Sequence, residues 1–588
     1  MAIYRAEQAR FSFASEAGHG GFPDFAHTYA DASSAWSGDV ATASIAGARS
    51  MSIERQSGSG TLALNELIRV GSRVSVAISG NDKYGGFNAE IRKVVKIVNS
   101  SGASVSSAGS GTYTIYVEQP FAFPHAASEL AVEANPAGID GDSYITFLPG
   151  VYEAVTVPDL TPELTPQYFL STGASRNWTT VYRGRQTFNG SLSNFIMLNG
   201  YALKYGIGRA GTVGTAVGSG GASTLANNTQ KGQTEIKLAA ATNYTVGDHI
   251  QVDTGANAEV RVIASIDGTF TTQFRLNYPL MNAHASGANC YEVVAPFVHT
   301  MTQDAELQSM TWNVFMRDTD EDADNDFVRR YVGGMVNTMT LSADEGEMLR
   351  CSWDNVNFLD MVHNQRLNVV TTPKATSALI DPTAEAGATN NVGIGGDRPR
   401  IAGTSPANLG HATYPTTEPY YFSQGELTFF GQTFARVRSF RLDVNNNIEP
   451  RFYINSDGTN RIVSDMQEQR REWRMTATIA MEDATASSTS TAKTLWRELI
   501  LEGEYGSGMQ GFDMVMTFTR GVDDTIVIKS PGNATTNNAG SGTGFGAQGC
   551  FIVCAPHNIG AESPLSLDVE ILVRDVSIVC TDSVGVYP

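Results

Sequence analysis

The sequence predicts an all-β protein built from β-sandwich domains. Charged residues make up 17% of the 588 residues, below the usual share of about 25%, while glycine occurs 58 times. Short segments rich in β-branched residues recur along the chain, and Gly/Ser/Asn clusters separate them; examples are 112–119, 259–266, 335–344 and 566–579. The chain is too long for one hydrophobic core, so we expect several domains.

The charge balance restricts the class of function. Sixty Asp and Glu residues stand against 40 Lys and Arg residues, a formal net charge of -20. A surface of this sign repels phosphate, which disfavours a protein that grips DNA or anionic lipid but allows one that surrounds DNA without holding it. Neither a long apolar run nor a secretory signal is evident, so we expect cytoplasmic synthesis and no membrane contact.

A short repeat predicts two small β modules. Residues 68–98 and 120–128 resemble 244–267 and 279–286. Both copies have Val-Gly before a strand, Asn-Ala-Glu opening the next, and a proline five residues before a His-Ala pair that begins at His125 or His284. Because both histidines recur inside a repeat, we expect them to have a structural role.

A longer repeat predicts two related large domains. Five blocks match in the same order: 166–173 with 450–458, 183–192 with 471–479, 202–208 with 502–508, 290–296 with 550–556, and 312–318 with 569–575. The first copy is longer where the second β module lies, so this module is interpreted as an insertion.

These repeats define the expected domain organisation, with one helix in each large domain. We expect the helices at 195–205, with Phe195, Leu198 and Leu203, and after a cap at Ser490 or Thr491. The predicted units are an N-terminal arm with first strands (1–60), a small β module (61–133), a first large domain (134–222 and 290–370), the inserted module (223–289), a linker or arm (371–424) and a second large domain (425–588).

The search for catalytic motifs predicts no enzyme and no cofactor. HExxH, paired CxxC and GxSxG are all missing from the sequence, and the glycine-rich stretch 540–546 is not followed by the Lys-Ser/Thr of a phosphate loop. The five cysteines are too few for a disulfide framework, so we expect packed thiols at Cys290, Cys351, Cys550, Cys554 and Cys580.

An acidic run is the one weak candidate for a cation site. It offers carboxylates at alternate positions, at Asp320, Asp322, Asp324 and Asp326. Asn325 replaces the glycine of an EF-hand loop and Tyr331 its final glutamate, so that motif does not fit. A solvated hairpin tip and an inter-subunit contact are the alternatives.

Three C-terminal segments, 429–483, 504–532 and 557–578, resemble the tail-tube proteins of tailed viruses, and 149–208 with 290–350 resemble them more loosely. The resemblance implies a structural virion protein, the major tail tube subunit, assembled in the host cytoplasm. It also implies self-association into stacked rings and contacts with tail tip or baseplate, tape measure and tail terminator proteins. DNA would pass through without specific binding.

The predicted duplication changes the expected ring. Two tube-like copies per chain would let three chains close a ring with pseudo-sixfold symmetry; a six-chain ring would mean that only the second copy lines the bore. A virion surface or fibre protein whose β modules bind host glycans is the alternative function. A depolymerase with two catalytic carboxylates is a third.

Overall fold

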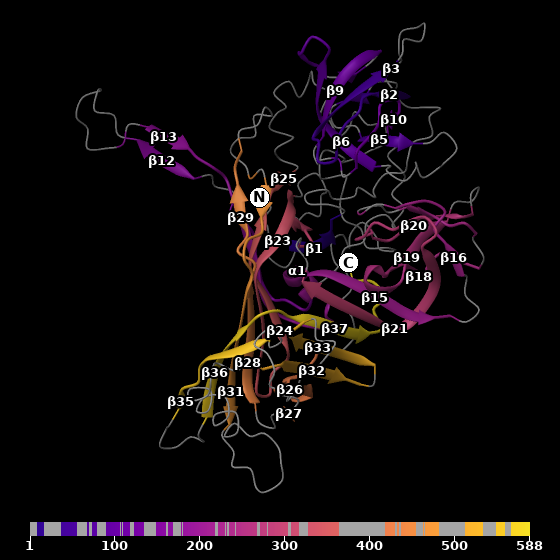
Figure 1. Ribbon diagram of the computed structural model, residues 1–588. Coiled ribbons are helices and arrows are strands. Elements are labelled where there is room, and N and C mark those ends of the chain that lie inside the picture. Colours follow the sequence, from indigo (N-terminus) through magenta and orange to yellow (C-terminus); the bar gives the residue numbers. More distant parts are fainter. Residues whose placement is uncertain are drawn as a thin grey trace, which may run out of the picture.

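The computed structural model confirms the all-β class, with strands dominating and one α-helix among the described residues. It describes residues 9–587 apart from 17–36, 56–67, 79–89, 134–148, 168–177, 317–326, 364–417, 481–511, 533–548 and several shorter stretches. Two twelve-stranded antiparallel sheets form the body, and a small barrel lies beside it (Figure 1).

The first sheet runs through both large predicted domains. Its strand order is β11-β14-β24-β23-β28-β31-β36-β34, with β1, β22, β25 and β35 attached to it. The strands are β1 (Ala9–Ser15), β11 (Val155–Thr156), β14 (Phe188–Ile196), β22 (Met310–Met316), β23 (Phe327–Asp344), β24 (Arg350–Phe358), β25 (Asp360–His363), β28 (Val437–Asn445), β31 (Glu472–Ala480), β34 (Cys550–Cys554), β35 (His557–Asn558) and β36 (Ser566–Val573).

The second sheet packs against the first. Its order is β17-β20-β19-β18-β21-β37-β33-β32-β26-β27, and β15 and β16 also pair with β21. The strands are β15 (Gly208–Ala216), β16 (Ala222–Thr224), β17 (Glu235–Lys237), β18 (His249–Val252), β19 (Glu259–Ile266), β20 (Gln273–Leu276), β21 (Asn289–Gln303), β26 (Gly425–Phe429), β27 (Gln432–Thr433), β32 (Met514–Arg520), β33 (Asp524–Ser530) and β37 (Ser577–Asp582).

Two small barrels share one strand order. In the first, the order β2-β10-β5-β6-β9-β3 closes on itself; in the second, β16-β21-β18-β19-β20-β17 is closed by a bridge between Leu225 and Leu238. This supports the predicted small repeat, although the first barrel begins at Ser37 and the second borrows the start of β21. The first barrel contains β2 (Ser37–Thr42), β3 (Ser50–Arg55), β5 (Arg73–Ile78), β6 (Glu90–Asn99), β9 (Gly111–Val117) and β10 (Leu130–Glu133), with β7 (Ser104–Val105) beside it and β4 (Ile68–Arg69) paired to β8 (Ser107–Ala108).

The strand order of the first sheet repeats on either side of the β23–β28 pairing. We call the part from β11 to β25 the N-terminal half and the part from β26 to β37 the C-terminal half. The order is β11-β14-β24-β23 in the N-terminal half and β28-β31-β36-β34 in the C-terminal half. By this order β14 corresponds to β31, β24 to β36 and β23 to β34.

Two of the five predicted block matches are wrong in their placement. Residues 290–296 lie on β21 in the second sheet, whereas 550–556 include β34 in the first. Residues 312–318 include β22, and 569–575 include β36, which corresponds to β24 instead. Short amphipathic strands have similar sequences wherever they lie, so local resemblance did not identify the matching strand.

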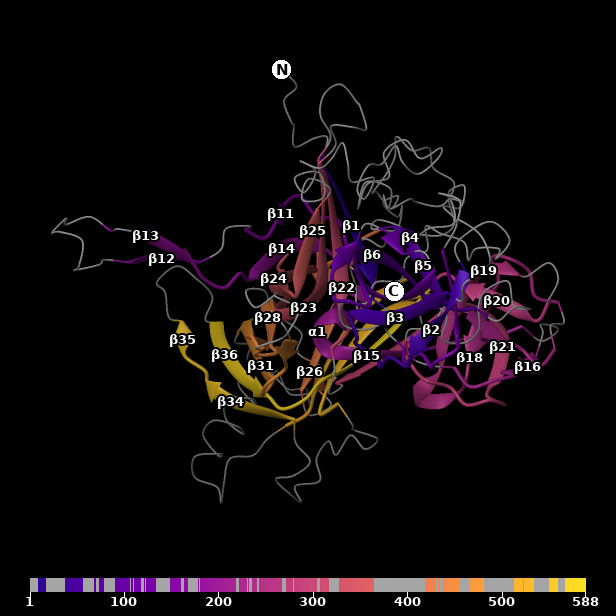
Figure 2. The same cartoon turned by 90° about the horizontal axis from the view of Figure 1, so that it is seen from above.

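Each half also carries a two-stranded hairpin just before its β14 or β31 strand. The hairpins are β12 (Leu164–Gln167) with β13 (Thr180–Arg183), and β29 (Glu449–Arg451) with β30 (Asp465–Gln467). Both views show β12 and β13 extending away from the body (Figures 1 and 2).

The helix α1 (Tyr201–Ile207) begins later than the predicted 195–205. Strand β14 continues to Ile196, which pairs with Arg350, so the segment around Phe195 is extended rather than helical. All seven helical residues are buried, and a Cβ at Gly206 would lie 2.5 Å from Met339 Sδ. The second predicted helix lies outside the described residues.

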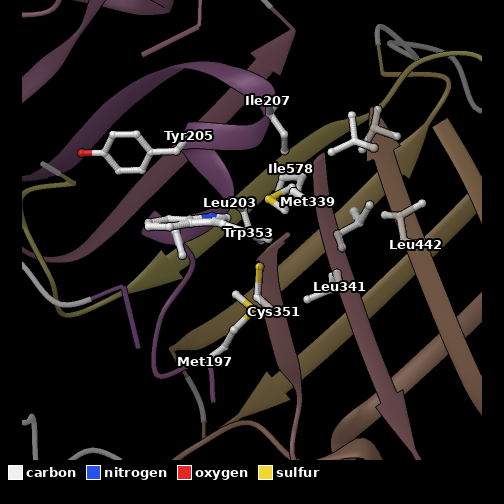
Figure 3. Packing of buried hydrophobic residues seen from close by; sticks show 14 of the residues in the cluster. Met197, Leu203, Tyr205, Ile207, Met339, Leu341, Cys351, Trp353, Leu442 and Ile578 are labelled. Carbon is white, nitrogen blue, oxygen red and sulfur yellow. The ribbon is translucent and has the colours of Figure 1, made fainter. Parts of the chain in front are cut away.

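The main hydrophobic core fills the space between the two sheets and includes residues from both halves. Trp353 is fully buried at its centre, with Tyr205 beside it and Met339 and Cys351 nearby (Figure 3). The Trp353 ring centroid lies 5.4 Å from that of Phe195 and 5.7 Å from that of Tyr205, both edge-to-face.

Trp353→Ala should lower the free energy of unfolding by about 3–5 kcal/mol, because a large cavity would open in a core that cannot fully collapse. The matched control is Trp178→Ala, since that side chain is 57% exposed and should change the unfolding of the isolated chain little. Chemical denaturation measures both. Equal losses for the two variants would contradict the packing described for this core.

Candidate functional site

The outer face of the first sheet is hydrated and charged. Inward residues of β31 and β36, such as Trp473 and Val569, are buried, and the residues that alternate with them are polar apart from Ala480 and Leu572 at the strand ends. Carboxylates outnumber arginines on this face among the alternating positions of the described strands, with Asp354, Asp443, Glu472, Asp568 and Glu570 against Arg350, Arg441 and Arg474.

Ion pairs and hydrogen bonds, within strands and between neighbouring strands, hold these charged side chains in place. Arg474 Nη1 donates to Glu570 Oε1 at 3.0 Å, with the two side chains 60% and 30% exposed. Thr340 Oγ1 lies 2.9 Å from Asp354 Oδ2 and 2.6 Å from Asp443 Oδ1. Exposed pairs of this kind add little stability, so their main effect is to keep the face hydrated and on balance acidic.

This polar face is continuous across the two halves. Seven residues of β23, Thr338–Asp344, pair antiparallel with Asn445–Ser439 of β28. Asn446 reinforces the join, because its Nδ2 donates to the carbonyl oxygens of Val336 and Gly206 at 2.9 and 3.1 Å. The halves are therefore joined by main-chain hydrogen bonds within one sheet.

Both ends of the first sheet present strand edges. At one end β34 pairs with β36, and among the described residues only a single bridge, from Cys550 to Phe512, covers its other edge. At the other end β14 pairs with the two-residue strand β11, and a single bridge joins Val151 to Ile196. Such edges are available for pairing with another chain.

The outer face of the second sheet is different, because valine and threonine dominate it. One cross-strand row runs Val213, Val298, Thr581, Thr525 and Thr519. Val213 and Val298 are 42% and 37% exposed. The two faces of the sandwich thus differ in charge.

A buried ionic network lies in the second small barrel. Glu259 accepts hydrogen bonds from Arg261 Nη2 at 2.7 Å and from the backbone N–H of Asn282 at 3.0 Å, and its Oε1 lies 2.7 Å from His284 Nε2. The other ring nitrogen of His284 lies 3.1 Å from Asp253 Oδ2. His125 in the first barrel has an analogous carboxylate partner in Glu129. Both histidines therefore hold strands together, which is the predicted structural role.

The network shifts the pKa values of its members. Burial by itself raises the pKa of Glu259, but Arg261 and His284 outweigh it and hold the pKa below the usual 4.5. Burial by itself lowers the pKa of His284, but Glu259 and Asp253 outweigh it and raise the pKa above the usual 6.5.

A second buried polar cluster joins α1 to the C-terminal segment. Lys204 Nζ donates to the Tyr587 carbonyl oxygen at 3.1 Å, and burial, with Arg261 adding, lowers the pKa of Lys204 to about 7. The Tyr587 ring stacks on His299 at 3.5 Å between centroids, and its hydroxyl donates to Asp582. These contacts fix the end of the described chain onto the core.

Comparison with known proteins identifies the family. A family model described as a phage tail tube protein matches residues 187–570, more than half of the chain. The chain belongs to the phage tail tube protein family. The match begins immediately before β14 and ends within β36, so it spans the β23–β28 pairing and both halves of the sandwich. Among curated proteins, none matches this chain.

Family membership makes this chain a structural component of a phage tail and agrees with the predicted resemblance. The charged face of the first sheet and its free edges are the features relevant to such a role. Glu472, Arg474 and Thr476 alternate with apolar residues in the sequence, and this alternation is the signal that points to that face.

The predicted cation candidates Asp320, Asp322, Asp324 and Asp326 lie outside the described residues, as does the glycine-rich stretch 540–546. Within the described part of the chain, no group of three or more His, Cys, Asp or Glu side chains is arranged to hold a metal ion. No helix in that part is long and apolar enough to span a membrane.

The five cysteines are free, as predicted. Four are buried, but Cys554 is exposed at the end of β34, where a register shift between Ile552 and Cys554 interrupts the alternation. The expectation that Cys554 is packed in the core is therefore wrong.

Glu259→Gln should lower the free energy of unfolding by about 3–5 kcal/mol near pH 5–6, because it removes the carboxylate beside the buried Arg261 and leaves His284 with Asp253 alone. The pKa of Glu259 is lower in the folded chain than the usual 4.5, so its stabilisation is complete above pH 4.5 and is lost as pH falls through the folded pKa. The pKa of His284 is higher in the folded chain than the usual 6.5, so its stabilisation is complete below pH 6.5 and is lost as pH rises through the folded pKa.

Thermal unfolding of wild type and variant across pH measures this difference. Asp253→Asn is the matched control. The Asp253 side chain contacts the same imidazole but is 26% exposed, so its replacement should lower the free energy of unfolding less. If the difference in stability between wild type and Glu259→Gln stayed constant from pH 3 to 9, the ionic network described for Glu259 and His284 would be contradicted.

Proposed function

We propose that this chain is the major tube subunit, and that rings of it stack into the hollow conduit through which the viral genome leaves the particle. The observation that carries the proposal is the first sheet. It runs unbroken through both halves, has an excess of carboxylates on its outer face, and ends in strand edges that are largely unpaired among the described residues. A closed ring of such sheets is a barrel, which removes the exposed edges.

The repeated strand order supports three chains per ring. Within the chain, β23 of the N-terminal half pairs with β28 of the C-terminal half. In the proposed ring, β34 of one chain pairs with β11 and the edge of β14 of the next chain. This contact between chains is equivalent to the pairing of β23 with β28 within one chain. Six similar wedges then come from three chains through head-to-tail contacts.

The charge of the polar face suits passage of DNA. With carboxylates in excess, the face repels phosphate, and its arginines are largely engaged by neighbouring acids such as Asp443 and Glu570. In this proposal the first sheet lines the bore, and the Val/Thr face of the second sheet points away from it. The tape measure, tail terminator and tail tip or baseplate proteins are the proposed partners in the virion tail, after assembly in the host cytoplasm.

A ring of three chains should have a mass of about 189 kDa, three times the 62.9 kDa chain, and threefold symmetry with a sixfold pseudo-repeat. Native mass spectrometry and end-on electron microscopy images measure these quantities. A ring of six chains with true sixfold symmetry would contradict the two-wedge arrangement. Isolated fibres without cylinders would instead favour the surface-protein alternative.

Replacing Asp443, Asp568 and Glu570 by Lys should make assembled tubes retain DNA at low salt and release it at high salt, because the new charges displace counterions from phosphate. Co-sedimentation of tubes with a labelled duplex measures retention. The control carries Lys at Thr215, Thr300 and Thr519, exposed positions on the second sheet. Equal retention by both variants would contradict the assignment of the bore face.

A further inference from the structure

The β12–β13 hairpin exposes large apolar side chains. Leu164 and Trp178 are each 57% exposed and Tyr182 is 55% exposed. The two strands form their own sheet and extend away from the body in both views (Figures 1 and 2). Among the described residues, nothing packs on these three side chains well enough to bury them.

The β29–β30 hairpin of the C-terminal half is its counterpart. Pro166 lies opposite Val181 in the first hairpin, and Pro450 lies opposite Met466 in the second. Counting from these pairs, Leu164 corresponds to Ile448, because each lies two residues before its proline. Trp178 corresponds to Val463, because each lies three residues before the paired residue.

The counterpart residues are buried because the second hairpin docks on a surface of the N-terminal half, formed by Leu307, Met335 and Leu359, which we call its seat. Ile448 is 6% and Val463 3% exposed. Together with Met466 they form a cluster with three residues of the N-terminal half, Leu307, Met335 and Leu359. Two hydrogen bonds fix the hairpin there, from Ile448 N to Asn337 Oδ1 at 2.7 Å and from Leu307 N to Glu468 Oε1 at 2.6 Å.

The equivalent seat on the C-terminal half is uncovered and presents apolar side chains of β34 and β36, with Arg574 at the position of Leu359. Phe358 and Val573 are the last inward residues of β24 and β36, opposite Phe188 and Trp473. Aligning them matches the cross-strand pair Met335–Asn357 with the pair Phe551–Leu572.

Exposure differs between these matched pairs. Met335 and Asn357 are 4% and 6% exposed, whereas Leu572 is 45% exposed and Phe551 is half-buried; Val553, two residues further along β34, is 57% exposed. The seat that the second hairpin covers on one half is thus uncovered on the other.

We propose that the β12–β13 hairpin of one chain docks on the Phe551–Leu572 face of a second copy of this chain. The chain cannot fill this seat itself, because the hairpin leads into β14 at one end of the first sheet and the seat lies on β34 and β36 at the other. This inference rests on the proposed ring and names the contact that joins its chains. Leu164 and Trp178 occupy the places of Ile448 and Val463.

The test compares two variants that remove equally exposed apolar groups from the same hairpin. Leu164→Asp with Trp178→Asp should raise the chain concentration needed for half-assembly at least about tenfold, because charges would enter an apolar interface. Tyr182→Asp should leave it unchanged, because Gln467, the counterpart of Tyr182, is exposed beside the docked hairpin. Native mass spectrometry over a concentration series measures assembly, and thermal unfolding of the monomers shows that each variant folds.

A cross-linking experiment locates the contact directly. In a Cys554→Ser background, chains with Trp178→Cys are mixed with chains carrying Leu572→Cys and treated with a short bismaleimide. Cross-linked pairs should form in the mixture and not with either chain alone. If wild-type chains form rings and the Leu164/Trp178 variant assembles equally well, the docking is overturned. Wild-type rings with no cross-link in the mixture also overturn it. Either result leaves the proposed tube function unaffected. A wild-type chain that remains monomeric would overturn both proposals.

Discussion

The main-chain pairing of β23 with β28 is the constraint on which the rest of the molecule depends. Seven consecutive residue pairs between Thr338–Asp344 and Asn445–Ser439 fix the register of one half against the other. Because side chains alternate along each strand, that register determines which residues enter the common core and which form the charged face. A slip of one residue would place Leu442 in water and Asp443 among aromatic rings.

Continuity of the core follows from this register. Trp353 of the N-terminal half and Met475 of the C-terminal half belong to one hydrophobic cluster, which also contains α1. Two of the buried ionisable groups are paired: Lys204 with the Tyr587 carbonyl, and His284 between Glu259 and Asp253. The first pair ties the C-terminal segment to α1, and the second holds the second barrel together. Strand β21 joins this barrel to the body, because it pairs with both β18 and β37.

The differences between the two halves are as informative as their similarity. Where the halves contact each other, Ile448 and Asn357 are buried; where no neighbour is present, their counterparts Leu164 and Leu572 are exposed. Apolar surface of this kind is unfavourable in water and is typical of a site that another protein covers. A head-to-tail assembly accounts for both, because each chain then presents one unfilled seat and one free hairpin.

The sequence by itself determined the all-β class, the tail-tube resemblance, the small repeat and the match between segments 166–173 and 450–458, which begin in β12 and β29, because alternation and turn residues are local signals. It misplaced the start of α1 and matched β21 with β34, because strand order depends on which distant strands pair. Only the tertiary structure decided that Glu472, Arg474 and Asp568 share one face, and that Ile448 is covered while Leu164 is not. Burial depends on contacts between residues far apart in the chain, which no local pattern encodes.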